Sequence, residues 1–142
     1  MKRYDVKKIG EKVLKQESVD VEHGEDVTEL VKDMYHIMKM ENGIGLAAPQ
    51  IGISKNIFVI DHGGKKAFIN PRIIKESGMK WPFLEGCLSI PGRTKIVWRK
   101  AYVDLEWYDE NWNKHRQKIG GIECRVIQHE YDHLKGILFI ER

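Results

Sequence analysis

The sequence has 142 residues, with 24 Lys and Arg against 21 Asp and Glu, a length that suits one domain with a hydrophobic core of ordinary size. Hydrophobic residues make up 42% and charged residues 32%, which excludes an intrinsically disordered chain, because large apolar residues are too frequent and the charge imbalance is too small. The net charge of +3 comes from scattered Lys and Arg residues, so we expect no direct binding to nucleic acid. No apolar run approaches the length of a membrane span, so we expect no membrane partner.

The first predicted element is an amphipathic helix over residues 26–40. Apolar residues recur there at the three- and four-residue spacing that places them on one helix face. Asp26 and Glu29 resemble a capping box at its start, and Gly43 would end it. Residues 43–50 follow with the sequence GIGLAAPQ, and their many small side chains predict an extended loop whose backbone other groups can approach.

The middle of the sequence predicts an antiparallel sheet. Short segments rich in β-branched and aromatic residues occur at 56–60, 67–70, 95–98 and 102–108. Polar turn residues at 109–114 separate the last of these from a further strand near 115–119, which predicts a hairpin. Residues 122–134 contain no Pro or Gly and predict a buried helix, followed by a short strand at 137–140. We therefore predict an α+β fold with antiparallel sheets packed around a central buried helix.

His129, Glu130 and His133 form an H-E-x-x-H pattern within that predicted helix. Four residues are slightly more than one helical turn, so both imidazoles share a face and can bind one metal ion. Glu130 lies beside them, at an angle that suits a general base rather than a ligand. Chance is the alternative, but two histidines inside a buried helix need partners for their polar atoms. We therefore predict a metal site.

A catalytic site of this kind needs a third protein ligand. Metallopeptidases with the same pattern take it from downstream, where few residues remain and Glu141 is the only acid. Cys87, in the segment EGCLS at 85–89, is the better candidate, although a small buried hydrophobic residue is the alternative for it. Cys124 is not predicted as a ligand, because it lies about 140° around the helix from His129.

Three segments resemble the signature motifs of the peptide deformylases, in the same order: GIGLAAPQ at 43–50, EGCLS at 85–89 and QHEYDHL at 128–134. The similarity continues around these motifs and covers nearly the whole chain. It implies one catalytic domain over residues 1–142, which removes the formyl group from N-formylmethionine of nascent polypeptides in a bacterial cytoplasm and releases formate. It also implies one divalent metal ion, Fe²⁺ in the cell, which Zn²⁺, Ni²⁺ or Co²⁺ can replace.

The resemblance and the chemistry together assign roles to the motif residues. Cys87, His129 and His133 bind the metal, which leaves a position for water and makes hydroxide available near neutral pH to attack the formyl carbon. Glu130 takes the proton of this water and then protonates the leaving amine. The resemblance adds the side-chain amide of Gln50 and the backbone N–H of Leu88 as donors to the developing oxyanion.

The resemblance also implies that the substrate binds as an added strand beside Ile44 and Gly45, with the Gly45 carbonyl accepting a hydrogen bond from the formyl amide. Ile122 and Val126 lie on the helix side that carries His129. Together with Ile44 they are predicted to line an apolar pocket for the methionine side chain. Plain core packing is the alternative for these residues.

The sequence stops at Arg142, where many bacterial deformylases continue into a helix that in some docks on the ribosome, and this shorter form resembles phage-encoded members. We therefore expect the docking helix to be absent. We also expect a monomer, because no heptad or exposed hydrophobic repeat predicts assembly. Cys124 replaces an Ala that is common in the family and adds a thiol near the site. Two other functions stay open: an H-E-x-x-H metallopeptidase, and a structural zinc domain in which His115 or Cys124 supplies a fourth ligand.

Overall fold

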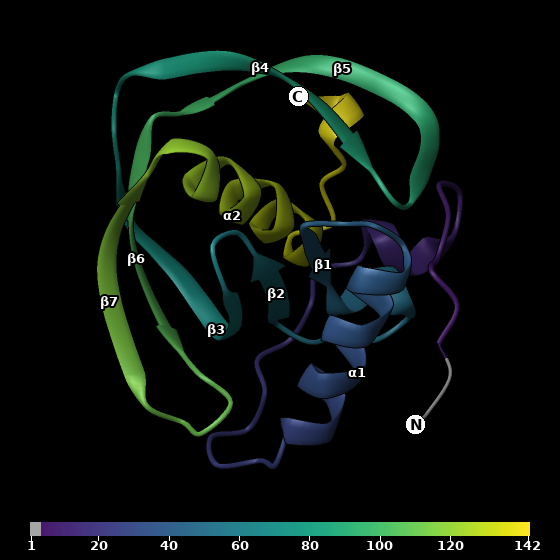
Figure 1. The fold of residues 1–142 in the computed structure, drawn as a ribbon, viewed down its shortest axis with the longest axis vertical. Coiled ribbons are helices and arrows are strands. Elements are labelled where there is room, and N and C mark those ends of the chain that lie inside the picture. The colour runs from purple at the N-terminus through teal and green to yellow at the C-terminus, as the bar shows by residue number, and fades with distance from the viewer. Residues whose placement is uncertain (1–3) are drawn as a thin grey trace.

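The computed structural model describes residues 4–142, which contain two antiparallel sheets, two α-helices and three short 3-10 helices (Figure 1). The larger sheet has the strand order β1-β2-β3-β6-β7, and the second sheet is the β4-β5 hairpin. The strands are β1 (Gly45–Ala47), β2 (Ile57–Asp61), β3 (Lys65–Glu76), β4 (Lys80–Cys87), β5 (Ile90–Lys100), β6 (Tyr102–Tyr108) and β7 (Lys114–Gly120). The helices are α1 (Thr28–Met40) and α2 (Gly121–Leu134), with 3-10 helices η1 (Lys12–Lys15), η2 (Ala48–Ile51) and η3 (Phe139–Glu141). No helix within residues 4–142 has both the length and the hydropathy needed to cross a membrane.

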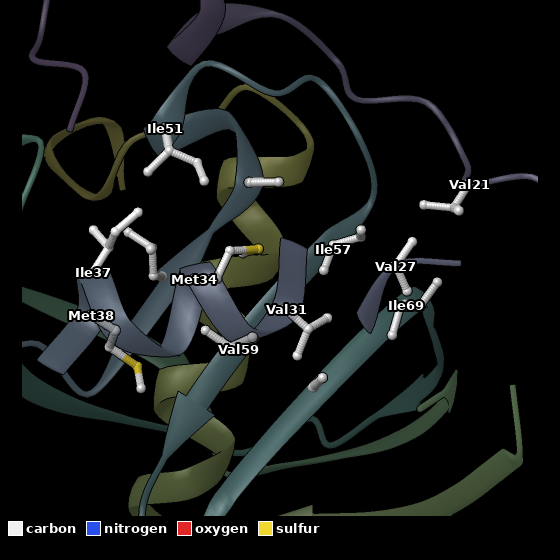
Figure 2. Packing of buried hydrophobic residues seen from close by; sticks show 13 residues of the cluster. Val21, Val27, Val31, Met34, Ile37, Met38, Ile51, Ile57, Val59 and Ile69 are labelled. Atoms are coloured by element: carbon white, nitrogen blue, oxygen red, sulfur yellow. The ribbon is translucent and has the colours of Figure 1, made fainter. Parts of the chain in front are cut away.

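Helix α1 covers one face of the larger sheet. Its buried residues Val31 and Met34 belong to the same core cluster as Val59 of β2, as Figure 2 shows. Phe58 and Ile60 of β2 belong instead to the cluster around α2, because successive side chains of a strand point to opposite faces. A strand that is buried on both faces has a continuous apolar run, which explains the sequence of β2.

Helix α2 lies at the centre of the fold, between the larger sheet and the β4-β5 hairpin (Figure 1). It packs against β1, β2 and β7 on one side and against β5 on the other. A third core cluster, under the hairpin, joins η1 and the C-terminal segment to β5 through Leu14, Ile90, Val97, Leu138 and Phe139. The predicted α+β fold with a central buried helix is confirmed.

Most elements predicted from the sequence are present. The helix at 122–134 is confirmed, and the helix at 26–40 is confirmed except that it begins at Thr28. Asp26 accepts hydrogen bonds from the backbone N–H of Thr28 at 3.1 Å and from its hydroxyl at 2.7 Å, so it stabilises the helix start through Thr28 rather than Glu29. The strands predicted between residues 56 and 119 and the hairpin of β6 and β7 are also present, and β3 and β5 are longer than predicted.

Two predictions about local structure are wrong, and one strand was not predicted. Residues 43–50 are not a loop throughout, because Gly45–Ala47 pair with β2 and Ala48–Ile51 form η2. Residues 137–140 form no strand and lead into η3 instead. Strand β4 is not predicted at all, because Pro82 interrupts the β pattern, yet Pro is tolerated in a strand with a free edge.

Gly136→Ala should destabilise the fold strongly. Gly136 has φ +73°, and a Cβ there would lie 2.6 Å from the backbone oxygen of Lys15. The substitution therefore combines left-handed backbone strain with a clash against backbone, and we expect the free energy of unfolding to fall by about 2–4 kcal/mol in urea denaturation. Gly24→Ala is the control, because Gly24 has φ +88° but a Cβ there would meet no other atom. This variant should lose only about 1 kcal/mol of unfolding free energy. Equal losses would contradict the steric explanation.

Candidate metal centre

Cys87, His129 and His133 come together in the folded chain, although 46 residues separate Cys87 from His133. One ligand atom of each residue lies within 4.8 Å of the others, and the Cys87 Sγ is 3.3 Å from the His133 Nε2. Helix α2 places the two imidazoles on one face. The strand pairing of the hairpin shifts register between Glu85 and Cys87, an irregularity of the kind that redirects a side chain.

Glu85 lies behind His129, and sequence reasoning assigned it no role. Its carboxylate accepts hydrogen bonds from the His129 Nδ1 at 2.9 Å, the Arg99 Nε at 2.6 Å and the Arg125 Nη1 at 2.6 Å. Burial by itself would raise the pKa of Glu85, but the hydrogen bonds from His129 and Arg99 outweigh burial and lower this pKa to about 2. A carboxylate on Nδ1 fixes the tautomer of the ring and leaves Nε2 free to bind a metal.

The donor set fits a divalent metal ion. A thiol and two imidazoles are ligands that Zn²⁺ and similar transition-metal ions prefer. Burial and the neighbouring charge of His129 lower the pKa of His133 well below its usual range, so its ring is neutral, the form that binds metal. Burial also acts to lower the pKa of His129, but hydrogen bonds with Cys87 and Glu85 raise it to about 10. The surroundings of His129 therefore favour a positive charge, which a metal ion on Nε2 would supply in place of a proton.

Glu130 is buried beside the three ligands. Burial raises the pKa of Glu130 to about 7, so its carboxylate can both accept and release a proton near neutral pH. Its Oε1 atom has no hydrogen-bond partner among residues 4–142. A Cβ on Gly45 would lie 2.5 Å from the Glu130 Oε2, so only glycine lets strand β1 approach this carboxylate so closely.

Gln50 is oriented by two contacts on opposite sides of its amide. Its Oε1 accepts a hydrogen bond from the Ala47 N–H at 2.9 Å, and its Nε2 donates to the Ser89 Oγ at 3.2 Å. The same Nε2 lies 3.5 Å from the Cys87 Sγ. Gln50 is only 1% exposed, so it is not a solvated loop residue. Sequence reasoning assigned Ser89 no role, and its place in the EGCLS segment is the signal that could have found it.

A cavity of about 410 Å³ adjoins these residues and is called the substrate cavity below. Its lining includes all the predicted substrate-binding residues, namely Ile44, Gly45, Ile122 and Val126, together with Gln50, Cys87, Leu88, His129 and Glu130. Ile44 is 52% exposed and Ile122 is 36% exposed, so core packing does not account for either side chain. Phe83 and Leu84 of β4 also line the cavity, and they were not predicted because β4 was not predicted.

The two candidates for a fourth protein ligand lie outside the metal group. His115 is on β7, where it contacts the Asp109 carboxylate at 2.8 Å and stacks on Trp107. The Cys124 Sγ accepts a hydrogen bond from the Gln128 Nε2 at 3.1 Å. Within the part of the chain that the structure describes, the group that could hold an ion contains three residues. This arrangement gives no support to a structural zinc site with four protein ligands.

The sequence profile of the polypeptide deformylase family matches residues 3–142. This chain belongs to the peptide deformylase family. A peptide deformylase of Cytophaga hutchinsonii is 41% identical over 148 aligned residues, which cover 97% of this chain and 80% of that protein. As a deformylase, the chain is a hydrolase that removes the formyl group from nascent polypeptides in a metal-dependent reaction, which sets aside the metallopeptidase alternative.

Solved deformylase structures share the fold. A probable peptide deformylase from Synechococcus phage S-SSM7 superposes with a TM-score of 0.93 at 38% identity, covering 98% of this chain and 99% of the phage chain. A class I type b peptide deformylase from Acinetobacter baumannii, bound to Met-Ala-Ser, has a TM-score of 0.92 at 30% identity and covers 98% of this chain and 97% of that chain. The predicted likeness to the family, including short phage-encoded deformylases, is confirmed.

Glu85→Ala should weaken both the fold and the metal centre. The change leaves the buried guanidinium groups of Arg99 and Arg125 without their shared carboxylate, so we expect the free energy of unfolding to fall by about 3–5 kcal/mol in urea denaturation. Metal affinity should fall about 10- to 100-fold, as measured by metal content after dialysis against a chelator. Glu85→Gln keeps the side-chain volume and should lose less stability while still losing metal. Unchanged metal content in both variants would contradict the positioning role.

Proposed function

We propose that this chain removes the formyl group from N-formylmethionine at the start of nascent polypeptides in the bacterial cytoplasm and releases formate. The observation that carries the proposal is that a three-residue metal group, a buried carboxylate and an oriented amide meet at one cavity in a member of the deformylase family. All of these groups come from one chain, so we propose that it works as a monomer.

Cys87, His129 and His133 would hold the metal ion, with Fe²⁺ as the ion in the cell and Zn²⁺, Ni²⁺ or Co²⁺ able to replace it. When bound, the ion supplies Lewis acidity, which lowers the pKa of water and stabilises negative charge on a carbonyl oxygen. Glu130 takes the proton from water and passes it to the leaving amine, for which a buried carboxyl with a pKa of about 7 is suited.

Gln50 and Leu88 would stabilise the negative charge that develops on the formyl oxygen. The Gln50 Nε2 and the Leu88 backbone N–H are the donors, and both residues line the substrate cavity. Ala47 and Ser89 hold the Gln50 amide in place before substrate binds. Donors that are oriented in advance need no rearrangement during the reaction, which is what makes them effective.

The substrate peptide would pair with the free edge of β1. This strand is at the end of the larger sheet, and the Ile44 carbonyl accepts a hydrogen bond from the Asp61 N–H at 2.9 Å, so the backbone of Gly45 faces the free edge. A peptide added beside Ile44 and Gly45 would then donate the hydrogen bond of its formyl amide to the Gly45 carbonyl. Ile44, Ile122 and Val126 would contact the methionine side chain. The Met-Ala-Ser bound to the Acinetobacter baumannii deformylase supports a substrate of this class.

The test is formate release from a formyl-Met-Ala-Ser peptide by anaerobically prepared, Fe²⁺-loaded protein. We expect release from this peptide and no hydrolysis of the acetylated peptide, because a deformylase must distinguish the formyl group from the larger acetyl group. Protein that holds one metal ion per chain and releases no formate would refute the proposed function.

Glu130→Gln should retain the metal and lose about 10²- to 10⁴-fold in the rate of formate release, because the amide cannot accept the proton of water. The metal content of the purified variant is the control, since Glu130 is not a proposed ligand. Near-normal turnover with metal bound would exclude Glu130 as the base.

Cys87→Ala should lose most of its metal during dialysis, because a site with two imidazoles lacks the third ligand. Cys124→Ala is the matched control, since it removes the other free thiol and leaves the metal group intact. Metal content measured by mass spectrometry compares the two variants. If Cys87→Ala holds as much metal as Cys124→Ala, Cys87 is not a ligand.

A further inference from the structure

A second cavity, of about 620 Å³, is lined from a different face of α2 and shares no lining residue with the substrate cavity. Helix α2 contributes Gln128, Tyr131, Asp132 and Lys135 to it, and the remaining walls are the end of β3, the start of β4, the end of β5 and the C-terminal segment. The function described above makes no use of this second cavity, which is called the basic cavity below.

The lining of the basic cavity has more cationic than acidic side chains. It contains six cationic side chains, namely Lys75, Lys80, Arg99, Lys100, Lys135 and Arg142, and two acidic ones, Glu76 and Asp132. Arg99 is buried and paired with both Glu85 and Asp132, Arg142 is paired with Asp132 at 2.7 Å, and the Lys135 amine lies 3.8 Å from the Glu17 carboxylate. Among residues 4–142, the amines of this lining that take part in no ion pair are those of Lys75, Lys80 and Lys100. The whole chain has a net charge of only +3, so folding concentrates positive charge at this one place.

Two of these lysines are placed at a cost to the fold. Lys80 of β4 and Lys100 of β5 are directly opposite each other in the hairpin, and like charges in such a pair are destabilising. Among the ion pairs formed within residues 4–142, none involves the amine of Lys80 or Lys100. A bound anion would relieve this repulsion.

An exposed indole lies among the lysines. Trp98 is 61% exposed, lines the basic cavity and shares a strand face with Lys100, two residues further along β5. Single-stranded nucleic acid is bound by this combination, in which bases stack on aromatic rings and phosphates contact basic side chains. An acidic peptide would explain the lysines but not the exposed ring. Exposed Leu84 and Ile96 share the hairpin face of Trp98, but neither lines the basic cavity, where the ring is surrounded by lysines instead.

We propose that the basic cavity binds single-stranded RNA, with a base stacked on Trp98 and phosphates held by Lys75, Lys80 and Lys100. The choice of RNA over DNA rests on the proposed function, because an enzyme that acts on nascent polypeptides works where RNA is the abundant polyanion. The proposal replaces the expectation from the sequence that the chain binds no nucleic acid.

The test is the fluorescence anisotropy of a labelled, unstructured RNA of about 12 nucleotides titrated with the full, metal-loaded chain. Three phosphate contacts should make the affinity fall about 20-fold between about 50 and 200 mM KCl. A DNA strand of the same sequence should bind with similar affinity, because base stacking and phosphate contacts do not involve the 2′-hydroxyl. No binding of RNA at the lower salt concentration would overturn the proposal.

Two substitutions in the cavity and one outside it test the placement. Trp98→Ala should weaken RNA binding about 5- to 150-fold through the loss of stacking. Lys80→Glu should weaken it about tenfold and also raise the thermal midpoint, since it turns a like-charge pair with Lys100 into an attractive one. Lys32→Glu, on the exposed side of α1, makes the same change in net charge and should leave the affinity within about twofold.

The outcomes separate this inference from the proposed function. Formate release by Trp98→Ala and Lys80→Glu should equal that of the unmodified chain, because neither residue lines the substrate cavity. Equal weakening by Lys32→Glu would show binding by net charge alone and would overturn the assignment to this cavity. Displacement of RNA by a poly-glutamate peptide of equal charge, as effectively as by unlabelled RNA, would indicate an acidic partner and would also overturn it.

Discussion

One buried carboxylate connects the parts of this molecule that carry its chemistry. Glu85 of β4 accepts hydrogen bonds from Arg99 of β5 and from Arg125 and His129 of α2. Charges buried in this way are stable only as a complete set, because removal of one partner leaves another uncompensated. The hairpin is therefore tied to the central helix at the level of the metal centre, and Cys87 follows Glu85 by two residues.

The same interaction explains why distant segments meet with fixed geometry. Cys87 belongs to a two-stranded sheet, and a hairpin by itself is only marginally stable in water. The contacts of Glu85 with α2 hold the hairpin against the helix face that carries His129 and His133. Strand β1 reaches the other side of this site because Gly45 has no side chain to collide with Glu130. The centre thus depends on one salt-bridge network and one glycine.

The network also continues beyond the metal centre. Arg99 donates to Glu85 on one side and to Asp132 on the other, and Asp132 accepts from Arg142 near the end of the chain. Arg99 and Asp132 line the basic cavity, whereas Glu85 lines the substrate cavity. The two cavities therefore lie on either side of a network of paired, buried charges.

The sequence by itself determined the features that depend on the geometry of a single element, above all the two histidine ligands. The H-E-x-x-H spacing places His129 and His133 on one face of any helix, and the motif residues indicated the remaining ligand and the family. Strand β4 was hidden by Pro82, and the orientation of Gln50 follows from contacts with residues far apart in the chain. Only the tertiary structure decided the role of Glu85 and the gathering of scattered lysines into one cavity, because both result from contacts between segments that no local pattern encodes.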